Sequence, residues 1–397
     1  MRRLLKKKKL VEILFEYNYE FPIYLVLVTC CQLYTHRYII FSSYERQGYQ
    51  KLRRGGAVQS FFHNVVSLSN LLQAWKEFKK CKTKKIDIAD FEFNLENNLF
   101  FLHQELINKT YKPAKYQAFF VYDPKRRHIH KAVVMDRVLN QAVFRVLYQI
   151  FDKHFIFHSY SSRLKKGTHK ASKNLFIALR KESKNWKQPV FVLKCDIKKF
   201  FDCIDHIILF ELIKKKISDA DTLWLIDKIL KSFEKSPNVG LHLGNVTSQL
   251  FANVYLNELD QFIKHKLKIE YYFRYADDFI LVSKNEKLLM YYKKEIEVFL
   301  RENLKLELHP DKVFIRKLKR GIDFVGYVIL PNVTVLRTRT KKRIFKKLMK
   351  AQKKLILKEI NKDKFQQIKV SYIGILKHCK SNEIKRKIRE VLLISGI

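Results

Sequence analysis

The sequence predicts an α+β fold in which a β-sheet is backed by helices. Segments with apolar residues three and four apart, typical of amphipathic helices, are interspersed with short apolar or alternating segments that are typical of strands. The chain has 397 residues, of which 47% are hydrophobic and 14% aromatic, so it can bury a large core and is too long for one small domain. We therefore expect two or three subdomains built around a layered sheet.

The N-terminal residues 1–60 have no clean helical or strand period and end with a glycine pair. We interpret them as a basic extension, either disordered or the result of a misplaced start codon. Their apolar stretch at 21–31 is too short to cross a bilayer, so we expect neither a signal peptide nor a membrane partner. The first predicted helix follows Ser67 or Ser69, because a serine caps the amphipathic pattern that begins there.

The next elements are a helix, a hairpin and a helix. Residues 90–108 have helical spacing, and residues 116–134 alternate like a hairpin with Asp123 and Pro124 at its turn. Helical spacing returns at residues 136–155.

The central part of the chain predicts a second sheet. The segment 188–205 begins with an apolar strand, and a lysine-rich helix, a loop and a helix from about Val246 to Lys268 follow. The run YYFRYADDFILVS predicts a hairpin with 276–278 at its turn, because apolar runs flank a short acidic pair. From about Thr338 the chain is lysine-rich, helical in period and free of glycine until Gly374.

The excess of positive charge predicts an anionic binding partner. Lysine and arginine total 80 against 38 aspartates and glutamates, which gives a formal charge of +42. Aromatic residues among the cations favour nucleic acid, although an AT-rich genome produces a similar composition. The six cysteines show no zinc-type spacing, so we expect reduced thiols in a cytosol. We expect a cytoplasmic protein that is bacterial, archaeal or phage-encoded.

Three aspartates form the candidate catalytic and metal-binding group. Asp277 and Asp278 occupy the predicted hairpin turn, and Asp196 follows the apolar strand VFVLKC. Hard cations prefer oxygen ligands, so the three carboxylates, with the carbonyl of Ile197, predict a site for two Mg²⁺ ions, with Mn²⁺ as a substitute. A solvated acidic turn is the alternative for the aspartate pair alone, and the apolar strands on both sides argue against it.

Ordered motifs resemble those of the reverse transcriptases from about residue 66 to the end of the chain. They are DPKRR with DRVLNQA, SYSSRLKKGTHKA, KCDIKKFF, LGNVTSQ, YADD, LKLELHPDK, IDFVGY and VSYIGILKHCKS. The resemblance implies an RNA-directed DNA polymerase, a nucleotidyltransferase with a right-hand architecture of fingers, palm and thumb. The palm would be an antiparallel sheet backed by helices. It also implies that 61–330 form the fingers and palm and that 331–397 form a basic helical thumb.

Within that family the chain most resembles the reverse transcriptases of diversity-generating retroelements. The loop expected to pack on the incoming nucleotide carries Leu243, Gly244, Ser248 and Gln249, where many relatives have a glutamine, a glycine and a final Ser-Pro. This resemblance implies error-prone copying of a template-repeat RNA, frequently at adenines, for mutagenic retrohoming. The implied partners are template RNA, primer, cDNA, deoxynucleotides and a small basic oligomeric accessory protein.

The resemblance also suggests roles for single residues around the incoming nucleotide. Phe201 matches the aromatic gate that excludes a ribose 2′-hydroxyl, and Lys125 and Arg127 match fingertip cations that grip the triphosphate. Lys312 is the candidate general acid for the pyrophosphate leaving group. A core phenylalanine, a solvated basic turn and a structural lysine are the respective alternatives.

Other matches fall on the template and primer side. Arg163 resembles a template or nucleotide contact, and Phe324, Gly326 and Tyr327 resemble a primer grip, with a surface arginine and an ordinary bulged strand as the alternatives. Asp202 and Asp205 are better explained as residues that order the helix after them than as catalytic acids.

Two other functions remain open at this stage. The first is another bacterial-type reverse transcriptase, either a group II intron maturase or an antiphage-defence enzyme, since GTHKASKNL and VSYIGILKHCKS also resemble maturases loosely. The second is a non-catalytic RNA-binding protein on a polymerase scaffold, which the three intact aspartates disfavour.

Overall fold

The computed structural model describes residues 60–122 and 127–393. The predicted extension therefore lies outside the described residues, except for Ser60, as does the predicted hairpin turn at Asp123 and Pro124. By its contacts, the chain from Ser60 onward forms one compact unit. Among the described helices, none combines the length and the apolar character needed to cross a bilayer.

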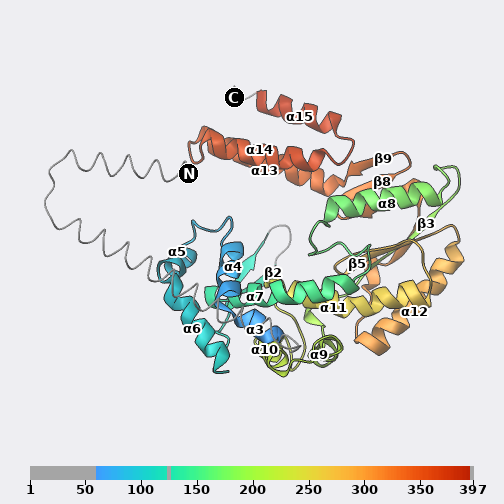
Figure 1. The fold of residues 1–397 in the computed structure, drawn as a ribbon. Coiled ribbons are helices and arrows are strands. Elements are labelled where there is room, and N and C mark those ends of the chain that lie inside the picture. The colour runs from blue at the N-terminus through green and yellow to red at the C-terminus, as the bar shows by residue number, and fades with distance from the viewer. Residues whose placement is uncertain (1–59, 123–126, 394–397) are drawn as a thin grey trace, which may run out of the picture. The chain divides into compact units, whose positions relative to one another are not determined.

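The first helices form a layer around α7 (Figure 1). The predicted cap is confirmed, because the Ser67 side chain accepts a hydrogen bond from the backbone N–H of Asn70 and so satisfies a free donor of the first turn. The single helix predicted at 90–108 is two helices that meet at Asn94. The helices of this layer are α3 (Phe61–Val66), α4 (Leu68–Phe78), α5 (Ile86–Phe93), α6 (Leu95–Ile107) and α7 (Val134–Phe151).

The predicted fingers hairpin consists of β1 (Gln117–Val121) and β2 (Arg127–Lys131), paired antiparallel. All five residues of β1 are exposed, so this hairpin projects from the core instead of completing a larger sheet.

The central sheet has the strand order β4-β5-β3-β6, and every pairing in it is antiparallel. Its strands are β3 (Phe191–Asp196), β4 (Tyr272–Tyr275), β5 (Asp278–Ser283) and β6 (Phe314–Lys317). Successive side chains of β5 alternate between two apolar clusters: Phe279 packs with the helices on one face, and Ile280 packs on the other. Helices α12 (Glu286–Leu304) and α8 (Thr168–Glu182) pack against these strands. The predicted α+β fold, an antiparallel sheet backed by helices, is confirmed.

The hairpin between β4 and β5 turns over Ala276 and Asp277, because Tyr275 pairs directly with Asp278. Ala276 has φ 54°, in the left-handed region that a tight two-residue turn between twisted strands requires. The outer edge of β4 is covered by residues 158–160, since the backbone of Arg274 exchanges hydrogen bonds with His158 and Tyr160.

Three further helices follow β3. The Asp205 carboxylate caps the first of them by accepting from the N–H groups of Ile207 and Ile208, as predicted, while Asp202 lies in a preceding 3₁₀ turn. The predicted helix from about Val246 ends as a π-helix, Phe262–Lys266. These helices are α9 (His206–Lys214), α10 (Ala220–Lys231) and α11 (Val246–Gln261), and the 3₁₀ turns are Asp152–His154, Phe200–Asp202, Pro310–Lys312 and Leu318–Arg320.

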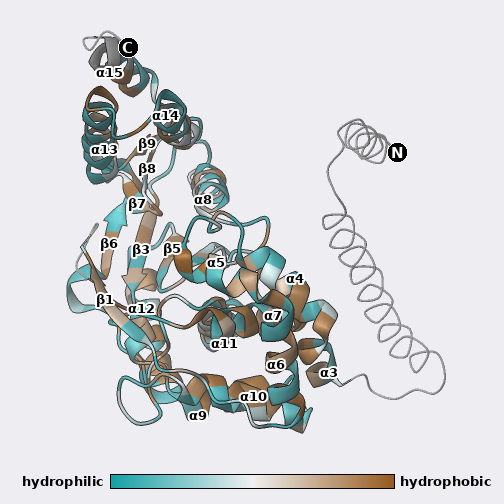
Figure 2. Ribbon diagram, turned by 90° about the vertical axis from the view of Figure 1, so that its left-hand side faces the viewer, coloured by the Kyte–Doolittle hydropathy of each residue, from teal (hydrophilic) through white to brown (hydrophobic). Residues whose placement is uncertain are grey.

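The C-terminal part has its own small sheet and apolar cluster. Strands β7 (Ile322–Phe324), β8 (Tyr327–Leu330) and β9 (Val333–Leu336) lead into α13 (Thr338–Ile356), α14 (Lys362–Leu376) and α15 (Asn382–Leu393). In Figure 2, α13 and α14 are mostly hydrophilic, whereas hydrophobic residues predominate along α9 and α10. The predicted boundary between residues 330 and 331 stays a prediction.

Candidate active site

The three candidate carboxylates lie at one end of the central sheet. Asp196 is the last residue of β3, and its partner across the ladder is Asp278, the first residue of β5. Asp277 occupies the turn between β4 and β5, and its carbonyl oxygen accepts a hydrogen bond from the N–H of Ile197 at 3.3 Å. The sheet thus brings together residues that are far apart in the sequence, and Ile197 is beside them.

Asp278 lies in the most desolvated part of this group. One of its oxygens, Oδ1, is buried and has no hydrogen-bond partner among the described residues, while Oδ2 lies 3.2 Å from Lys194 Nζ. Burial raises the pKa of Asp278 to about 6, and the neighbouring Asp196 and Asp277 add to that rise, whereas the Lys194 ammonium opposes it. A proton or a cation at this carboxylate is therefore favoured.

Asp196 faces a different lysine. Lys312, in the turn before β6, places Nζ 2.7 Å from Asp196 Oδ1, and its side chain remains about half exposed. The backbone carbonyl of Asp196 accepts from His309 N at 2.7 Å, which fixes that turn against the end of β3. The candidate general acid therefore lies beside a candidate metal ligand.

The donor set fits a divalent cation in chemical terms. Asp196, Asp277 and Asp278 offer carboxylate oxygens, which hard cations prefer, and the unpaired buried oxygen of Asp278 lacks the partner that a buried charge requires. Within the described ranges, no three His, Cys, Asp or Glu side chains are gathered closely enough to be recognised as a metal site. Lysine ammonium groups contact two of the three carboxylates.

A pocket opens next to the carboxylate turn. It has about 550 Å³ of empty space, and three of its lining residues are the candidates Phe201, Leu243 and Gln249. Ala276 of the turn also lines it, so the pocket adjoins Asp277. The remaining lining residues are Ser161, Ser162, Phe200, Ala252 and Asn253.

A buried ion pair supports both the pocket and the turn. Arg274 is fully buried and donates to both oxygens of Asp260 on α11, at 2.7 and 2.6 Å. The same guanidinium donates to the pocket residue Asn253 and to the carbonyl of Ala276. Through Arg274, Asp260 thus fixes the positions of β4, the carboxylate turn and the pocket residue Asn253 relative to one another.

Arg163 makes hydrogen bonds within the protein. Its guanidinium donates to the Asp152 carboxylate and to the carbonyl oxygens of Ile156 and Ser159, and its side chain is only 7% exposed. These bonds stabilise the loop before α8 and leave little of the side chain for a template or a nucleotide.

Two of the primer-grip candidates belong to the protein interior. Phe324 is completely buried in the cluster under α8, and Tyr327 is 2% exposed in the cluster of the C-terminal helices. Gly326, with φ 90°, and Val325, with φ 45°, form a tight turn between β7 and β8, so this segment is a hairpin and not the bulged strand that was the alternative to a primer grip.

The fingertip candidates are only partly described. Lys125 lies outside the described residues, and only the backbone of Arg127 is described, as the residue of β2 that pairs with Val121. Gly244 has φ 132°, a conformation that favours glycine, and it leads into the buried Ser248 on α11.

Sequence reasoning missed Lys194, Asn253 and Ser162. Lys194 had a recognisable signal, since it is the one basic residue of the strand Phe191–Asp196 and lies two residues before Asp196, on the same face. Asn253 also had a signal, because it lies four residues after Gln249 in the predicted helix and so on the same face. Ser162 had none, because only tertiary packing brings it to Gln249 and the pocket.

The comparisons with known proteins begin with a family model. Residues 123–329, more than half of the chain, match the model described as "Reverse transcriptase (RNA-dependent DNA polymerase)". The chain belongs to the reverse transcriptase family. The reverse transcriptase described here is an RNA-directed DNA polymerase, and the predicted right-hand polymerase fold is confirmed.

Relatives of this reverse transcriptase include bacterial proteins. Protein YkfC of Escherichia coli K12 is 26% identical over 271 residues, which cover 58% of this chain and 70% of that protein. The group II intron-encoded protein LtrA of Lactococcus lactis is 26% identical over 312 residues, which cover 60% of this chain. The reverse transcriptase matches only 50% of the length of LtrA.

A solved structure, apo telomerase from Candida tropicalis truncated from its C-terminal domain, is 14% identical with a TM-score of 0.44. The match covers 60% of this chain and 59% of the telomerase chain, and it is too distant to carry an argument.

Proposed function

We propose that this reverse transcriptase copies a template-repeat RNA into cDNA for a diversity-generating retroelement, with frequent errors at template adenines. The observation that carries the proposal is the pocket beside the carboxylates, which is lined by Leu243 and Gln249. An apolar Leu243 offers no hydrogen bond to a nascent base pair, so discrimination there depends on shape alone, which a mismatch of similar size satisfies.

Our proposal assigns the metal to Asp196, Asp277, Asp278 and the carbonyl of Ile197. Bound Mg²⁺ or Mn²⁺ would stabilise negative charge on the attacking and leaving oxygens of phosphoryl transfer. Lys312 would hold a proton beside the leaving pyrophosphate, and Phe201 would exclude a ribose 2′-hydroxyl from the pocket. Arg127 and Lys125 would contact the triphosphate, and the turn at Gly326 would approach the primer.

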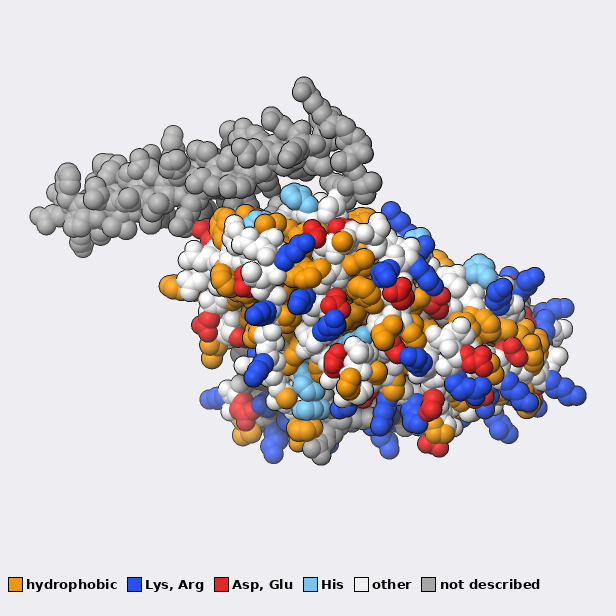
Figure 3. Space-filling model, turned by 90° about the horizontal axis from the view of Figure 1, so that it is seen from below, with side chains coloured by type: hydrophobic (Ala, Val, Ile, Leu, Met, Phe, Trp, Pro, Cys, Tyr) orange, Lys and Arg blue, Asp and Glu red, His pale blue; other side chains and the backbone are white. Residues whose placement is uncertain are grey.

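The charge of the chain supports a nucleic-acid substrate. Lysine and arginine side chains are spread over the face shown in Figure 3, in keeping with the formal charge of +42. Template RNA and deoxynucleotides follow from the family, whereas a small basic oligomeric accessory protein and a cytoplasmic location remain parts of the proposal.

A group II intron-type role is the second candidate, because LtrA is among the relatives. The genomic neighbourhood separates the two roles. A near-duplicate repeat that differs at adenine positions would support the retroelement, whereas an intron RNA around the gene would support the maturase role and refute ours.

The catalytic assignment has its own test. We expect the parent protein to extend a primer on an RNA template with Mg²⁺, and Asp277→Ala to lose extension by a factor of at least about 10³, since the carboxylate contacts the reacting group through the metal. Asp202→Ala is the matched control, an aspartate close in sequence to Asp196 that lies outside the site. Unchanged extension by Asp277→Ala would remove the proposed active site.

A further inference from the structure

The loop 240–245, which carries Leu243, is attached on two sides. On one side, the N–H of Leu241 donates to the carbonyl of Phe201 at 2.7 Å. On the other side, His242 Nε2 is hydrogen-bonded to the carbonyl oxygen of His130, a residue of β2 in the fingers hairpin. Leu243 follows these attachments directly in the chain and lines the proposed nucleotide pocket. The loop therefore links the proposed ribose gate to the fingers.

The His242 ring is held by an aromatic cluster. It stacks on Tyr116 with 4.4 Å between ring centroids and an interplanar angle of 25°. Phe233 meets it edge-on at 5.4 Å, and the ring of His130 lies at 6.4 Å. Only 4% of His242 is exposed, so its orientation is determined by the protein and not by solvent.

The neutral His242 ring is a hydrogen-bond donor with one fixed partner. Burial lowers its pKa to about 4, so the imidazole is neutral at physiological pH. Nε2 faces a carbonyl oxygen and must therefore carry the ring proton. The other nitrogen, Nδ1, is buried and has no hydrogen-bond partner among the described residues. The bond to His130 is thus the polar contact that fixes the ring.

The chain after His242 leaves little room for independent motion. A Cβ added at Gly244 would lie 3.2 Å from His242 Cε1, which is tighter than ordinary van der Waals contact. The side chain of Asn245 donates to the Tyr116 hydroxyl at 3.4 Å, so the same cluster also contacts the start of α11. A displacement of the His242 ring must therefore displace Leu243.

We propose that His242 is a positioning residue for nucleotide selection, which transmits the position of the fingers hairpin to Leu243 through its hydrogen bond to the His130 carbonyl. This inference rests on the proposed function, since it takes the pocket lined by Leu243 as the nucleotide site. His242 lies outside the pocket lining and acts through Leu243.

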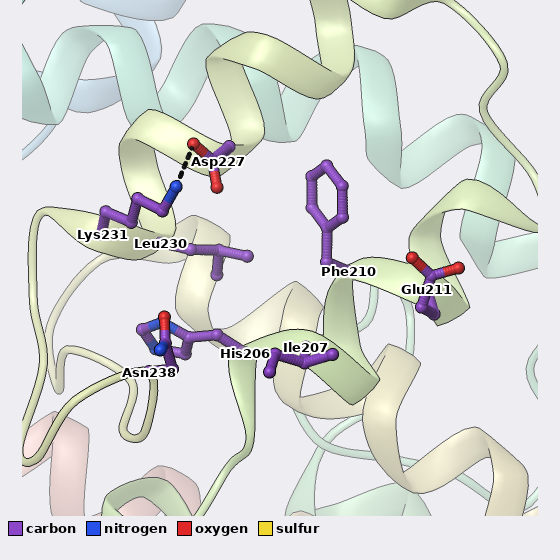
Figure 4. A pocket seen from close by; sticks show the side chains of 8 residues that line it. All are labelled: His206, Ile207, Phe210, Glu211, Asp227, Leu230, Lys231 and Asn238. Carbon is purple, nitrogen blue, oxygen red and sulfur yellow. Dashed lines mark hydrogen bonds and ion pairs between the residues drawn. The ribbon is translucent and has the colours of Figure 1, made fainter.

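His206, the first residue of α9, provides a matched control because it contacts the same loop. It is also a buried histidine, 5% exposed, and its Nε2 is bonded to the carbonyl of Gly240 at 2.6 Å. Figure 4 shows it in a separate pocket between α9 and α10, beside Asn238, Ile207 and Leu230. His206 therefore anchors the loop to the helices without contacting the fingers hairpin.

The test compares His242→Phe, His242→Gln and His206→Gln in single-nucleotide extension on an RNA template, with correct and incorrect deoxynucleotides. His242→Phe keeps a planar ring and loses the donor, whereas His242→Gln keeps a donor at a similar distance. We expect His242→Phe to raise KM for the correct nucleotide about fivefold, the equivalent of one net hydrogen bond, and to alter discrimination with kcat nearly unchanged. His242→Gln should restore KM in part, and His206→Gln should change only the melting temperature.

The inference is overturned if His242→Phe leaves KM and discrimination unchanged, or if His206→Gln changes them equally. His242→Met is a second donor-free variant, should the phenylalanine variant fail to fold. The Leu243→Ala variant distinguishes a failure of the proposed role of His242 from a failure of the proposed nucleotide pocket. If Leu243→Ala alters selection and the donor-free variants do not, only the inference fails; if Leu243→Ala also has no effect, the assignment of the pocket fails.

Discussion

Replacing Arg274 by methionine should be among the most damaging single changes outside the carboxylate group. Arg274 and Asp260 are both completely buried, and the guanidinium makes four hydrogen bonds, two of them to the Asp260 carboxylate. In the Arg274→Met variant, the Tyr272 hydroxyl, at 2.8 Å, is the one side-chain donor that Asp260 keeps within the described part of the chain. A buried carboxylate without its counter-ion costs about 3–5 kcal/mol.

The magnitude can be measured by thermal unfolding followed by circular dichroism. At roughly 2–4 °C per kcal/mol for a chain of this size, the loss corresponds to a fall in melting temperature of about 10 °C. The double variant Arg274→Met, Asp260→Leu removes both charges and should recover most of that loss, because a hydrophobic pair of similar volume replaces a buried ion pair at little cost. A single variant within about 1 kcal/mol of the parent, or a double variant no better than the single, would refute this reasoning.

Four further predictions concern the site and its support. Phe201→Ala should admit ribonucleotides, measured as a fall of about tenfold or more in the selectivity for deoxynucleotides in primer extension; unchanged selectivity would contradict the gate. Because burial raises the pKa of Asp278 to about 6, protons should compete with the metal, so the Mg²⁺ concentration needed for half-maximal extension should rise as pH falls from 7 to 5. In EDTA, with no metal bound, the raised pKa of Asp278 means that the folded state favours the neutral carboxyl. The contribution of this carboxyl to stability is therefore complete below the unfolded pKa of about 3.9 and is lost as pH rises through about 6. Melting temperatures measured across that pH range check the sign. Asp205→Ala removes the cap of α9 and the ion pair with Lys305, so it should lower the free energy of unfolding in urea by about 1–2 kcal/mol. The control Asp227→Ala removes only an exposed ion pair on α10 and should cost less than about half of that.

The sequence predicted elements whose signal is local. The Ser67 cap, the strand before Asp196 and the hairpin around Asp277 depend on short-range patterns, and the structure contains all of them. The three aspartates could be placed at one sheet end because Asp196 and Asp278 are strand-end residues and Asp277 is in the adjoining turn, and strand ends meet when strands pair in register.

Other features depend on contacts that no local pattern encodes. Phe324 and Tyr327 matched a motif, yet the structure buries both, because Phe324 packs in the cluster under α8 and Tyr327 packs against the C-terminal helices. The break at Asn94 interrupts a continuous helical pattern for a similar reason, since α5 and α6 each pack their own buried face. The role of Arg163 was also not predictable, because its partners come from a turn and a loop that only the fold brings close.

The strand order β4-β5-β3-β6 also has a consequence for biosynthesis. Strand β3 is flanked by β5 and β6. Strand β5 is translated only after the helices α9, α10 and α11, and β6 only after the long α12 as well. Until residue 317 has left the ribosome, β3 cannot have both neighbours, and such long-range pairing is slow because loop closure precedes any gain from contacts. The growing chain therefore exposes an apolar, unpaired strand for much of its synthesis, which makes β3 the segment where chaperone binding or aggregation of the nascent chain is most expected.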